Sequence, residues 1–366
     1  MKMKKFKKII CIILVVCFGC IVCSCGETGE KVTPQNGQTV VVSNLEVDEF
    51  VSKEWNINLC DDYYEEKWCH YEPCLVDFKW QKKADAFFIS TSKDMSNAIE
   101  YSVEGNEFFI RGLKTATTYY WQVAKDSKKS EVYHFNTEKG VRTLYIGGVT
   151  NSRDMGGWAV YDDEGNEKGY LRQGLLIRTA SLDKISPDGV NCLVNELKVK
   201  TELDLRAESE TGERPIIDGI NYINVSCPQY AYSGMGIFEF DGGEHSNANA
   251  VKNIISVFAN EQNYPINFHC AIGRDRTGTI AFLLGALCGM SEEDLCREYD
   301  ISFFAGLDSS KPYRMHTVAF LPLIDKMKAY KDETKSLAYN ARQYLLDIGI
   351  TQGQIDSIID ILVEEV

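Results

Sequence analysis

The segment between residues 265 and 290 constrains the fold of this chain more than any other part of the sequence. A short apolar run, PINFHC, reads as a strand that ends at Cys270, and a five-residue loop, AIGRD, leads from it to Arg276. From Thr277 to Met290 nearly every residue is apolar, so this stretch is expected to be a helix that is buried on all sides. A buried strand followed directly by a buried helix is typical of a layered α/β fold.

The remainder of the chain after about residue 140 agrees with that fold. RTLYIGG, GLLIRTA, KTELDLR and NYINVS have strand patterns, and they alternate with the helical patterns SPDGVNCLVNEL and ANAVKNIISVFANE. Ser186 is placed to cap the first of these helices, with Pro187 at its first position. We therefore expect an α/β domain over residues 140–366, with a largely parallel sheet flanked by helices.

Residues 47–139 have a different pattern, made of short runs of β-prone residues. VDFKW, DAFFISTS, NEFFIRGL, TYYWQVAK and EVYHFNT are separated by polar turns, which predicts an all-β sandwich before the α/β domain. The run from Leu113 to Tyr119 resembles the tyrosine corner of fibronectin type III domains, in which a tyrosine hydroxyl bonds to upstream backbone. This resemblance covers about residues 76–137, and none of these residues is expected to be catalytic.

The N-terminus has the pattern of an export signal. MKMKKFKK carries five lysines and no acidic residue, and the apolar run that follows, residues 9–23, is short for a membrane span. The sequence VCSC, which ends at Cys25, resembles a bacterial lipobox; the alternative is an ordinary signal peptide with incidental cysteines. We expect a signal peptide over 1–24, lipid on Cys25 and a flexible tether over 25–46. The protein is then expected in the cell envelope, anchored to a bacterial membrane and facing outward.

Charge and cysteine spacing narrow the function further. The net charge is −14, which argues against nucleic acid as a partner, because such proteins need a basic surface. Eight cysteines follow Cys25 and none forms a CxxC pair, so a zinc ribbon is not expected. Cys60, Cys69 and Cys74 are close enough in sequence to hold one disulfide, with the pairing left open. The five histidines show no ligand spacing, so we expect neither a metal nor another cofactor.

The loop after Cys270 offers a site for a tetrahedral anion. A strand–loop–helix turn directs successive backbone N–H groups to one point, and the helix N-terminus adds partial positive charge. Arg276 contributes a planar fork that matches two phosphate oxygens. The same field favours the thiolate of Cys270 at the floor of this cradle. Complete ionisation increases the thiolate population only about thirtyfold, so positioning and charge stabilisation must supply most of the catalysis.

The sequence HCAIGRDRTG carries a family resemblance. His-Cys, five residues and Arg-Thr-Gly resemble the signature loop of protein tyrosine phosphatases. The aspartate before the arginine makes the loop similar to that of bacterial tyrosine and lipid phosphatases, which reads HCxxGKDRTG. Three further segments fit this subgroup in its order: NSRDMGG at 151–157, LIRTASL at 176–182, and DLR at 204–206 with Glu210 downstream. The resemblance covers about residues 143–366.

The resemblance implies a role for each residue of the loop. Cys270 attacks phosphorus and forms a thiophosphate intermediate, and Thr277 assists departure of the thiolate. His269 is expected to fix the loop through backbone bonds, and Gly273 to adopt a positive φ. The residues expected to surround the substrate are His269, Ala271, Ile272, Gly273, Arg274, Arg153, Asp154 and Arg178. Arg274 replaces the subgroup's Lys and keeps its charge, and Ser152 stands where an aromatic residue is commoner.

Two carboxylates compete for the role of general acid. Asp275 lies inside the loop, where the neighbouring cations are expected to keep it ionised. Asp204 ends the strand KTELDLR, and the carboxyl ends of parallel strands line the ligand crevice of an α/β sheet. We predict Asp204 as the acid, with Asp275 as the alternative. The predicted catalytic residues are therefore Cys270, Arg276, Thr277 and these two aspartates.

The expected activity is hydrolysis of phosphomonoesters through the cysteine. Expected substrates are phosphotyrosine proteins, with phosphoserine, phosphothreonine and phosphoinositides as further ones. A phytase or inositol phosphatase of the same class is an alternative, and the basic Arg274 is consistent with a highly charged substrate. A phospho-ligand binding module with an inactive loop would contain the same cradle without turnover. A rhodanese-like enzyme also uses a loop cysteine, but its loop usually lacks the x5-Arg-Thr spacing, which disfavours it.

Overall fold

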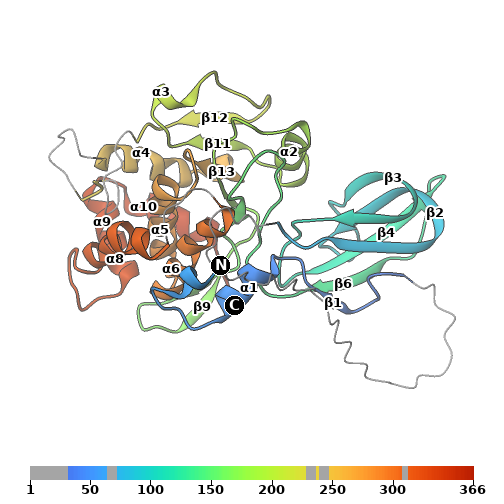
Figure 1. The fold of residues 1–366 in the computed structure, drawn as a ribbon, viewed down its shortest axis with the longest axis horizontal. Coiled ribbons are helices and arrows are strands. Elements are labelled where there is room, and N and C mark those ends of the chain that lie inside the picture. The colour runs from blue at the N-terminus through green and yellow to red at the C-terminus, as the bar shows by residue number, and fades with distance from the viewer. Residues whose placement is uncertain (1–31, 64–71, 228–235, 239–246, 307–311) are drawn as a thin grey trace, which may run out of the picture.

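The computed structural model describes residues 32–63, 72–227, 236–238, 247–306 and 312–366. Figure 1 shows two lobes, an N-terminal β lobe with strands β1 to β6 and an α/β lobe with strands β7 to β14 and the helices. The predicted signal peptide, the predicted lipidation site Cys25 and the cysteine Cys69 lie outside the described residues. Within the described residues, no helix has both the length and the apolar character that a membrane span requires.

A five-stranded sheet organises the α/β lobe, with the strand order β12-β11-β13-β10-β7. All neighbours are parallel except the short edge strand β7, which confirms the predicted largely parallel α/β sheet. β13 lies between β10 and β11, so Cys270, which follows β13, lies at the centre of the carboxyl edge. The strands are β7 (Arg153–Asp154), β10 (Leu176–Thr179), β11 (Thr201–Asp204), β12 (Asn221–Asn224) and β13 (Ile266–His269).

Apolar residues cover both faces of this sheet. Alternate residues of β10 point to opposite sides, so Leu176 joins the larger core cluster and Ile177 the smaller one. The larger cluster contains α4 (Ala248–Phe258), α5 (Asp275–Cys288), α9 (Leu337–Asp347) and α10 (Gln352–Leu362). The smaller cluster lies under α2 (Pro187–Asn191) and the π-helical turn Cys192–Glu196. Every residue of α5 after Asp275 is buried, which confirms the predicted core helix.

The other elements of the lobe extend this frame. They are α3 (Glu208–Thr211), α6 (Glu292–Asp300), α7 (Pro312–Met315), α8 (Leu321–Lys328) and a small sheet of β8 (Ala159–Tyr161), β9 (Glu167–Leu171) and β14 (Val363–Glu365). Ser186 caps α2 and Pro187 is its first residue, as predicted. The predicted strand RTLYIGG does not form. It makes only isolated bridges, because the chain turns at Gly148, whose φ is 79°, and Ile146 pairs with Val149 across that turn.

The N-terminal β lobe is one folded-over sheet rather than two separate sheets. Its strand order is β1-β6-β4-β2-β3, with β5 paired to β4. Phe78 and Phe87 belong to the same long strand, β2, yet their ring centroids lie 4.8 Å apart. The strand can fold back in this way because its register shifts between Lys79 and Ala84. The strands are β1 (Gln38–Val40), β2 (Val76–Ser90), β3 (Ile99–Ile110), β4 (Thr118–Lys125), β5 (Lys128–Lys129) and β6 (Tyr133–Thr137).

The predicted tyrosine corner forms at the start of β4. The backbone N–H of Lys114 donates a hydrogen bond of 2.8 Å to the hydroxyl oxygen of Tyr119, which is buried. The Tyr119 ring stacks on Phe135 of β6 with 5.7 Å between centroids. The corner therefore fixes the entry of β4 against the core of the lobe.

The segment before β2 differs from the predicted tether and domain boundary. β1 pairs in parallel with β6, and Val42 is buried in the β lobe, so residues 38–42 are part of the fold. Helix α1 (Leu45–Ser52), capped by the Asn44 side chain, buries Val47 and Phe50 in the large core of the α/β lobe. A helix of only two turns gives too few apolar repeats to be recognised from sequence. The two described cysteines of the N-terminal cluster, Cys60 and Cys74, are unpaired.

Candidate active site

The loop from Cys270 to Arg276 connects the central strand to the core helix. β13 ends at His269 and α5 begins at Asp275, two residues earlier than the sequence suggests. Arg276 therefore lies in the first turn of α5, where the unpaired backbone N–H groups and the helix dipole favour an anion. Cys270 is 1% exposed and Arg276 is fully buried. The thiol and the guanidinium thus lie in a desolvated position at the start of a helix.

Gly273 lets this loop approach the neighbouring strand. Its φ is +72°, as predicted, which favours glycine. A Cβ atom at this position would lie 2.2 Å from the carbonyl oxygen of Thr179 at the end of β10. Any larger residue would therefore push the loop away from the sheet.

Four successive carbonyl groups of the loop accept contacts from outside it. His269 Nδ1 lies 3.1 Å from the Cys270 oxygen, and the Ser181 N–H donates to the Ala271 oxygen at 3.1 Å. The Asn151 amide donates to the Ile272 oxygen at 3.0 Å, and Arg178 donates to the Gly273 oxygen at 2.6 Å. A trans peptide directs its C=O and N–H in opposite directions. The N–H groups of residues 271–274 therefore point away from these partners, which leaves them available to surround an anion.

Arg153 and Arg178 bind protein groups that support the loop. Both are fully buried, and both bind the carboxylate of Glu298 on α6, Arg153 at 2.7 Å. Arg153 also donates to the side-chain oxygen of Asn151 at 2.7 Å. The predicted substrate-binding role of these arginines is therefore replaced by a positioning role. Asp154 is likewise buried, and it accepts from Arg142 at 2.9 Å.

Replacing Glu298 by glutamine is expected to lower the free energy of unfolding by about 3–5 kcal/mol. The reason is that two buried guanidinium groups would lose their shared carboxylate. Urea unfolding followed by circular dichroism measures the change. Glu293→Gln on the same helix is the control, because that side chain is 58% exposed and its ion pair with Arg297 contributes little. Equal stability of the two variants would contradict the anchoring role of Glu298.

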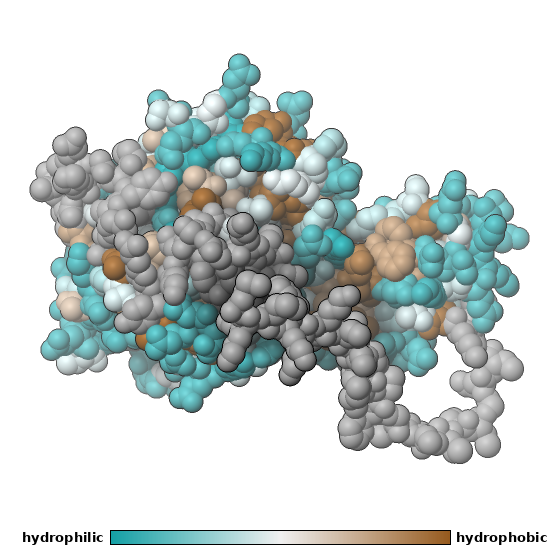
Figure 2. Space-filling view, viewed as in Figure 1, coloured by the Kyte–Doolittle hydropathy of each residue, from teal (hydrophilic) through white to brown (hydrophobic). Residues whose placement is uncertain are grey.

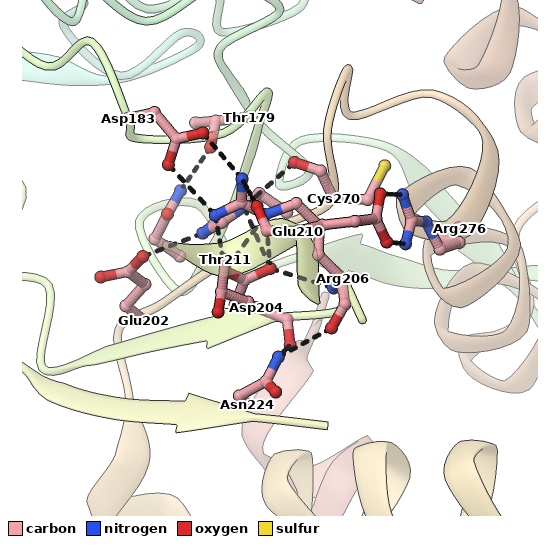
Figure 3. Close-up of polar contacts among 12 residues, drawn as sticks. Thr179, Asp183, Glu202, Asp204, Arg206, Glu210, Thr211, Asn224, Cys270 and Arg276 are labelled. Atoms are coloured by element: carbon pink, nitrogen blue, oxygen red, sulfur yellow. Dashed lines mark hydrogen bonds and ion pairs between the residues drawn. The ribbon is translucent and has the colours of Figure 1, made fainter. Parts of the chain in front are cut away.

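Glu210 binds the fork of Arg276 (Figure 3). Its two carboxylate oxygens accept from the two Nη atoms at 2.7 and 2.9 Å. The Arg276 contact and the neighbouring backbone lower the pKa of Glu210 and keep it ionised. The sequence predicts that both prongs of the fork bind phosphate, whereas here they bind a carboxylate. Glu210 thus fixes the orientation of the guanidinium at the start of α5.

Asp204 is enclosed by basic groups at the end of β11. Arg206 contacts both carboxylate oxygens, with the shortest contact at 2.8 Å, and its own backbone N–H donates to Asp204 at 3.0 Å. Burial raises the pKa of Asp204, but Arg206 and His269 outweigh it and leave the pKa below its usual value. Asp204 is also fully buried. A buried carboxylate held ionised has no proton to give, which argues against the predicted acid.

Asp275 lies in the first turn of α5 and its side chain is 24% exposed. Its contact with Arg274 measures 3.0 Å, and the Arg274 guanidinium lies 5.2 Å from the centre of the Phe303 ring. Part of the Asp275 side chain is therefore in contact with solvent, next to the cysteine loop. The hydroxyl of Thr277, which is expected to assist departure of the thiolate, is buried and has no hydrogen-bond partner among the described residues, so it does not hydrogen-bond to the Cys270 sulfur here.

Sequence comparison agrees with this geometry. Residues 144–364, more than half of the chain, match the sequence model described as the tyrosine phosphatase family. The chain belongs to the tyrosine phosphatase family. A protein named tyrosine-protein phosphatase from Nostoc commune is 30% identical over 142 residues, which are 35% of this chain and 48% of that protein. The chain therefore spans about half the length of this curated relative.

Two solved structures were also matched. The Siw14 catalytic core is 19% identical, and the match covers 39% of this chain and 85% of that chain with a TM-score of 0.26. The core catalytic domain of the PP-IP phosphatase SIW14 from S. cerevisiae, in complex with citrate, is 20% identical. That match covers 39% of this chain and 86% of the SIW14 chain, also with a TM-score of 0.26. These scores are too low to support conclusions about fold or substrate.

In this tyrosine phosphatase domain, one cluster has the composition of a metal site. Ligand atoms of Glu202, Asp204 and His269 lie within 4.8 Å of one another, and all three residues are buried. However, His269 Nε2 already contacts Glu202 at 3.0 Å, and a guanidinium spans both oxygens of Asp204. The cluster therefore fits a hydrogen-bonded support for His269 better than a cation site. The other nitrogen of His269 contacts the Cys270 carbonyl, a contact of the kind expected if His269 fixes the loop.

Glu298 is the residue of the site that sequence reasoning missed. It lies in EEDLCREYD on α6, where the neighbouring acidic residues Glu292 and Glu293 are exposed. Its partner Arg153 is 145 positions earlier in the chain. The sequence does contain one indication of such a residue. Arg153 and Arg178 are charged residues in segments expected to be buried, and buried positive charges require a buried acidic partner.

Proposed function

We propose that this protein is a cysteine-dependent phosphomonoester hydrolase. One observation carries the proposal: the carbonyls of residues 270–273 all contact groups outside the loop, which directs the N–H groups of residues 271–274 away from those partners, between Cys270 and the start of α5. Such a cradle matches the equatorial oxygens of a phosphoryl group. The family membership of residues 144–364 supports the same chemistry.

The reaction follows in two steps. The Cys270 thiolate attacks phosphorus, the bond to the leaving oxygen breaks, and a general acid gives that oxygen its proton. Water then attacks the thiophosphate, the sulfur–phosphorus bond breaks, and the acid recovers a proton from the water. Asp275 is proposed as this acid, because it is partly exposed and lies one residue before Arg276, whereas Asp204 is buried and held ionised. Arg276, oriented by Glu210, stabilises the charge on the phosphoryl group.

The proposed substrate is a simple phosphomonoester, with phosphotyrosine first. The sequence connects Arg274 with highly charged substrates such as inositol phosphates. In the fold, however, Arg274 is only 4% exposed, contacts the carboxylate of Asp275 and lies over the ring of Phe303. A guanidinium that is buried and held against protein groups in this way is poorly placed to attract a second phosphate group. This arrangement favours phosphotyrosine over inositol polyphosphates, with phosphoserine, phosphothreonine and phosphoinositides as weaker substrates.

The proposal is tested with p-nitrophenyl phosphate in the presence of EDTA, followed by a substrate panel. Turnover without metal is expected, and a phosphotyrosine peptide should be hydrolysed faster than a phosphoserine peptide, a phosphoinositide or inositol hexakisphosphate. Binding of phosphate without any turnover would identify an inactive binding module instead. Preferred hydrolysis of inositol hexakisphosphate would identify a phytase.

We also propose that the enzyme is a lipoprotein of the cell envelope that faces outward, with a fibronectin type III-like β lobe between the membrane and the phosphatase. The lysine-rich start, the short apolar run and the lipobox-like VCSC support the anchor. The hydrogen bond of the tyrosine corner supports the resemblance of the β lobe.

Cys25 is expected to take up labelled palmitate in a bacterial host. Cys25→Ala should lose the label and move to the soluble fraction, because a chain without lipid lacks the buried hydrocarbon that holds it at the membrane. Cys74→Ala is the control and should keep both label and membrane association. If Cys25→Ala still sediments with membranes, another segment provides the anchor.

A further inference from the structure

A cleft of about 710 Å³ separates the two lobes at a distance from the cysteine loop. One wall is the edge strand β3, which pairs only with β2 and contributes Tyr101 and Phe108. The opposite wall contains Glu196 from the π-helical turn beside α2. None of residues 270–276 belongs to the lining. Figure 2 shows apolar side chains on the β lobe where it meets the α/β lobe.

Two basic side chains from different lobes meet in this cleft. Arg142, which is 8% exposed, donates to the Gly112 carbonyl at 2.9 Å and to the Asp154 carboxylate at 2.9 Å. The half-buried Lys114 has no ion pair or hydrogen bond from its ammonium group to any residue that the structure describes. Burial and then Arg142 lower the pKa of Lys114, so the position disfavours the charged ammonium group and nearby carboxylates do not offset this effect.

The backbone makes room for this lysine. A Cβ atom at Gly174 would lie 3.4 Å from Lys114 Nζ, and Gly174 has a φ of +89°. The Lys114 side chain therefore passes over the backbone of Gly174, which carries no side chain, into the cleft between the lobes. The Asp154 carboxylate beside the pair is already engaged by Arg142 and by the N–H groups of Gly156 and Gly174. Glu364 also acts on Lys114 electrostatically but forms no ion pair with it, so the Lys114 ammonium group remains without a direct partner among the described residues.

The walls beside the basic end suit an apolar body. The rings of Tyr101 and Phe108 lie 5.0 Å apart, and Phe108 contacts Phe87 at 5.1 Å in the core of the β lobe. Burial and the Glu196 carboxylate raise the pKa of Tyr101, so its phenol stays a neutral hydrogen-bond donor at physiological pH. Glu196 on the opposite wall would repel an anionic group, and it therefore directs such a group toward Lys114.

We propose that this cleft binds an organic anion whose charged group lies against Lys114 and Arg142 and whose aromatic or aliphatic body lies against the rings of β3. A carboxylate, sulfonate or phosphate meets this description. The proposal does not depend on the phosphatase activity, because it involves no residue of the cysteine loop.

The test uses 1-anilinonaphthalene-8-sulfonate, a permanently charged aromatic anion, with the full chain and a fluorescence titration. Lys114→Met keeps the aliphatic stem and removes the charge, so it is expected to weaken binding at least about tenfold. Lys139→Met is the control, since Lys139 is exposed and does not line this cleft. Thermal melts of both variants verify that they are folded.

A second measurement keeps the protein unchanged. N-phenyl-1-naphthylamine has the same rings without the sulfonate, and wild-type protein should bind it at least about tenfold more weakly than the sulfonate. The proposal is supported if both the lysine and the sulfonate contribute to affinity. It is overturned if Lys114→Met binds the sulfonate as tightly as Lys139→Met, or if the charged and uncharged probes bind wild-type protein equally.

Discussion

Replacing Cys270 by serine is expected to reduce hydrolysis of p-nitrophenyl phosphate by at least about a thousandfold. A serine hydroxyl stays protonated at neutral pH, and no residue that the structure describes hydrogen-bonds to the Cys270 side chain as the activating base of a serine hydrolase would. Binding of phosphate should survive, because the anion cradle is built from the backbone of residues 271–274 and from the start of α5. The variant therefore separates the nucleophile from the binding site.

Two measurements check this expectation. Initial rates with p-nitrophenyl phosphate give the loss of turnover. The affinity of the wild-type enzyme for phosphate is obtained from inhibition by phosphate, and that of the Cys270→Ser variant from calorimetry. Cys74→Ser makes the same chemical change in the β lobe, at an unpaired, half-buried cysteine, and should keep wild-type activity. Residual turnover of more than a few per cent in Cys270→Ser would show that the sulfur is not the nucleophile.

The features of this site that can be predicted from the sequence are those that are determined by residues of the same short segment. The strand before Cys270, the buried helix after it and the positive φ of Gly273 all follow from residues within one short segment. Hydrophobic periodicity and glycine conformation act locally, so they can be read without a fold. The largely parallel sheet follows from the alternation of such segments.

The parts that sequence does not predict are pairings of distant charges. Arg178 looks like a ligand for phosphate when only its strand is known, but it binds the Gly273 carbonyl and the carboxylate of Glu298, which lies 120 positions away. Arg276 likewise has Glu210 as its partner. A guanidinium suits a phosphate, a carboxylate or a carbonyl equally well by its chemistry. Only the tertiary arrangement decides which of them it meets.

The same reasoning changes the assignment of the general acid. The prediction of Asp204 rests on its place at the end of a parallel strand, and the fold does put it level with His269 beside β13. What the pattern could not show is that Arg206, two residues later, turns back and contacts both oxygens of Asp204. Its pKa is held below the usual value, so its protonated form is scarce at neutral pH. Asp275 is therefore the better candidate.

Asp275→Asn is expected to slow hydrolysis of phenyl phosphate by about 10²–10⁴ and that of p-nitrophenyl phosphate far less. The reason is that phenolate is a poor leaving group that needs a proton, whereas p-nitrophenolate leaves readily without one. The basic limb of the pH–rate profile should also flatten, because that limb reports loss of the acid's proton. Asparagine has nearly the same shape as aspartate, so the contact with Arg274 is kept in part.

Asp204→Asn is the matched comparison, because it makes the same change on the competing candidate. It should slow both substrates by a similar factor, since Arg206 loses a charged partner and the support of the loop is weakened without loss of an acid. Rates with both substrates across the pH range distinguish the two aspartates in one data set. If Asp204→Asn showed the leaving-group dependence and Asp275→Asn slowed both substrates equally, the acid would be Asp204, and its ion pair with Arg206 would have to open during the reaction.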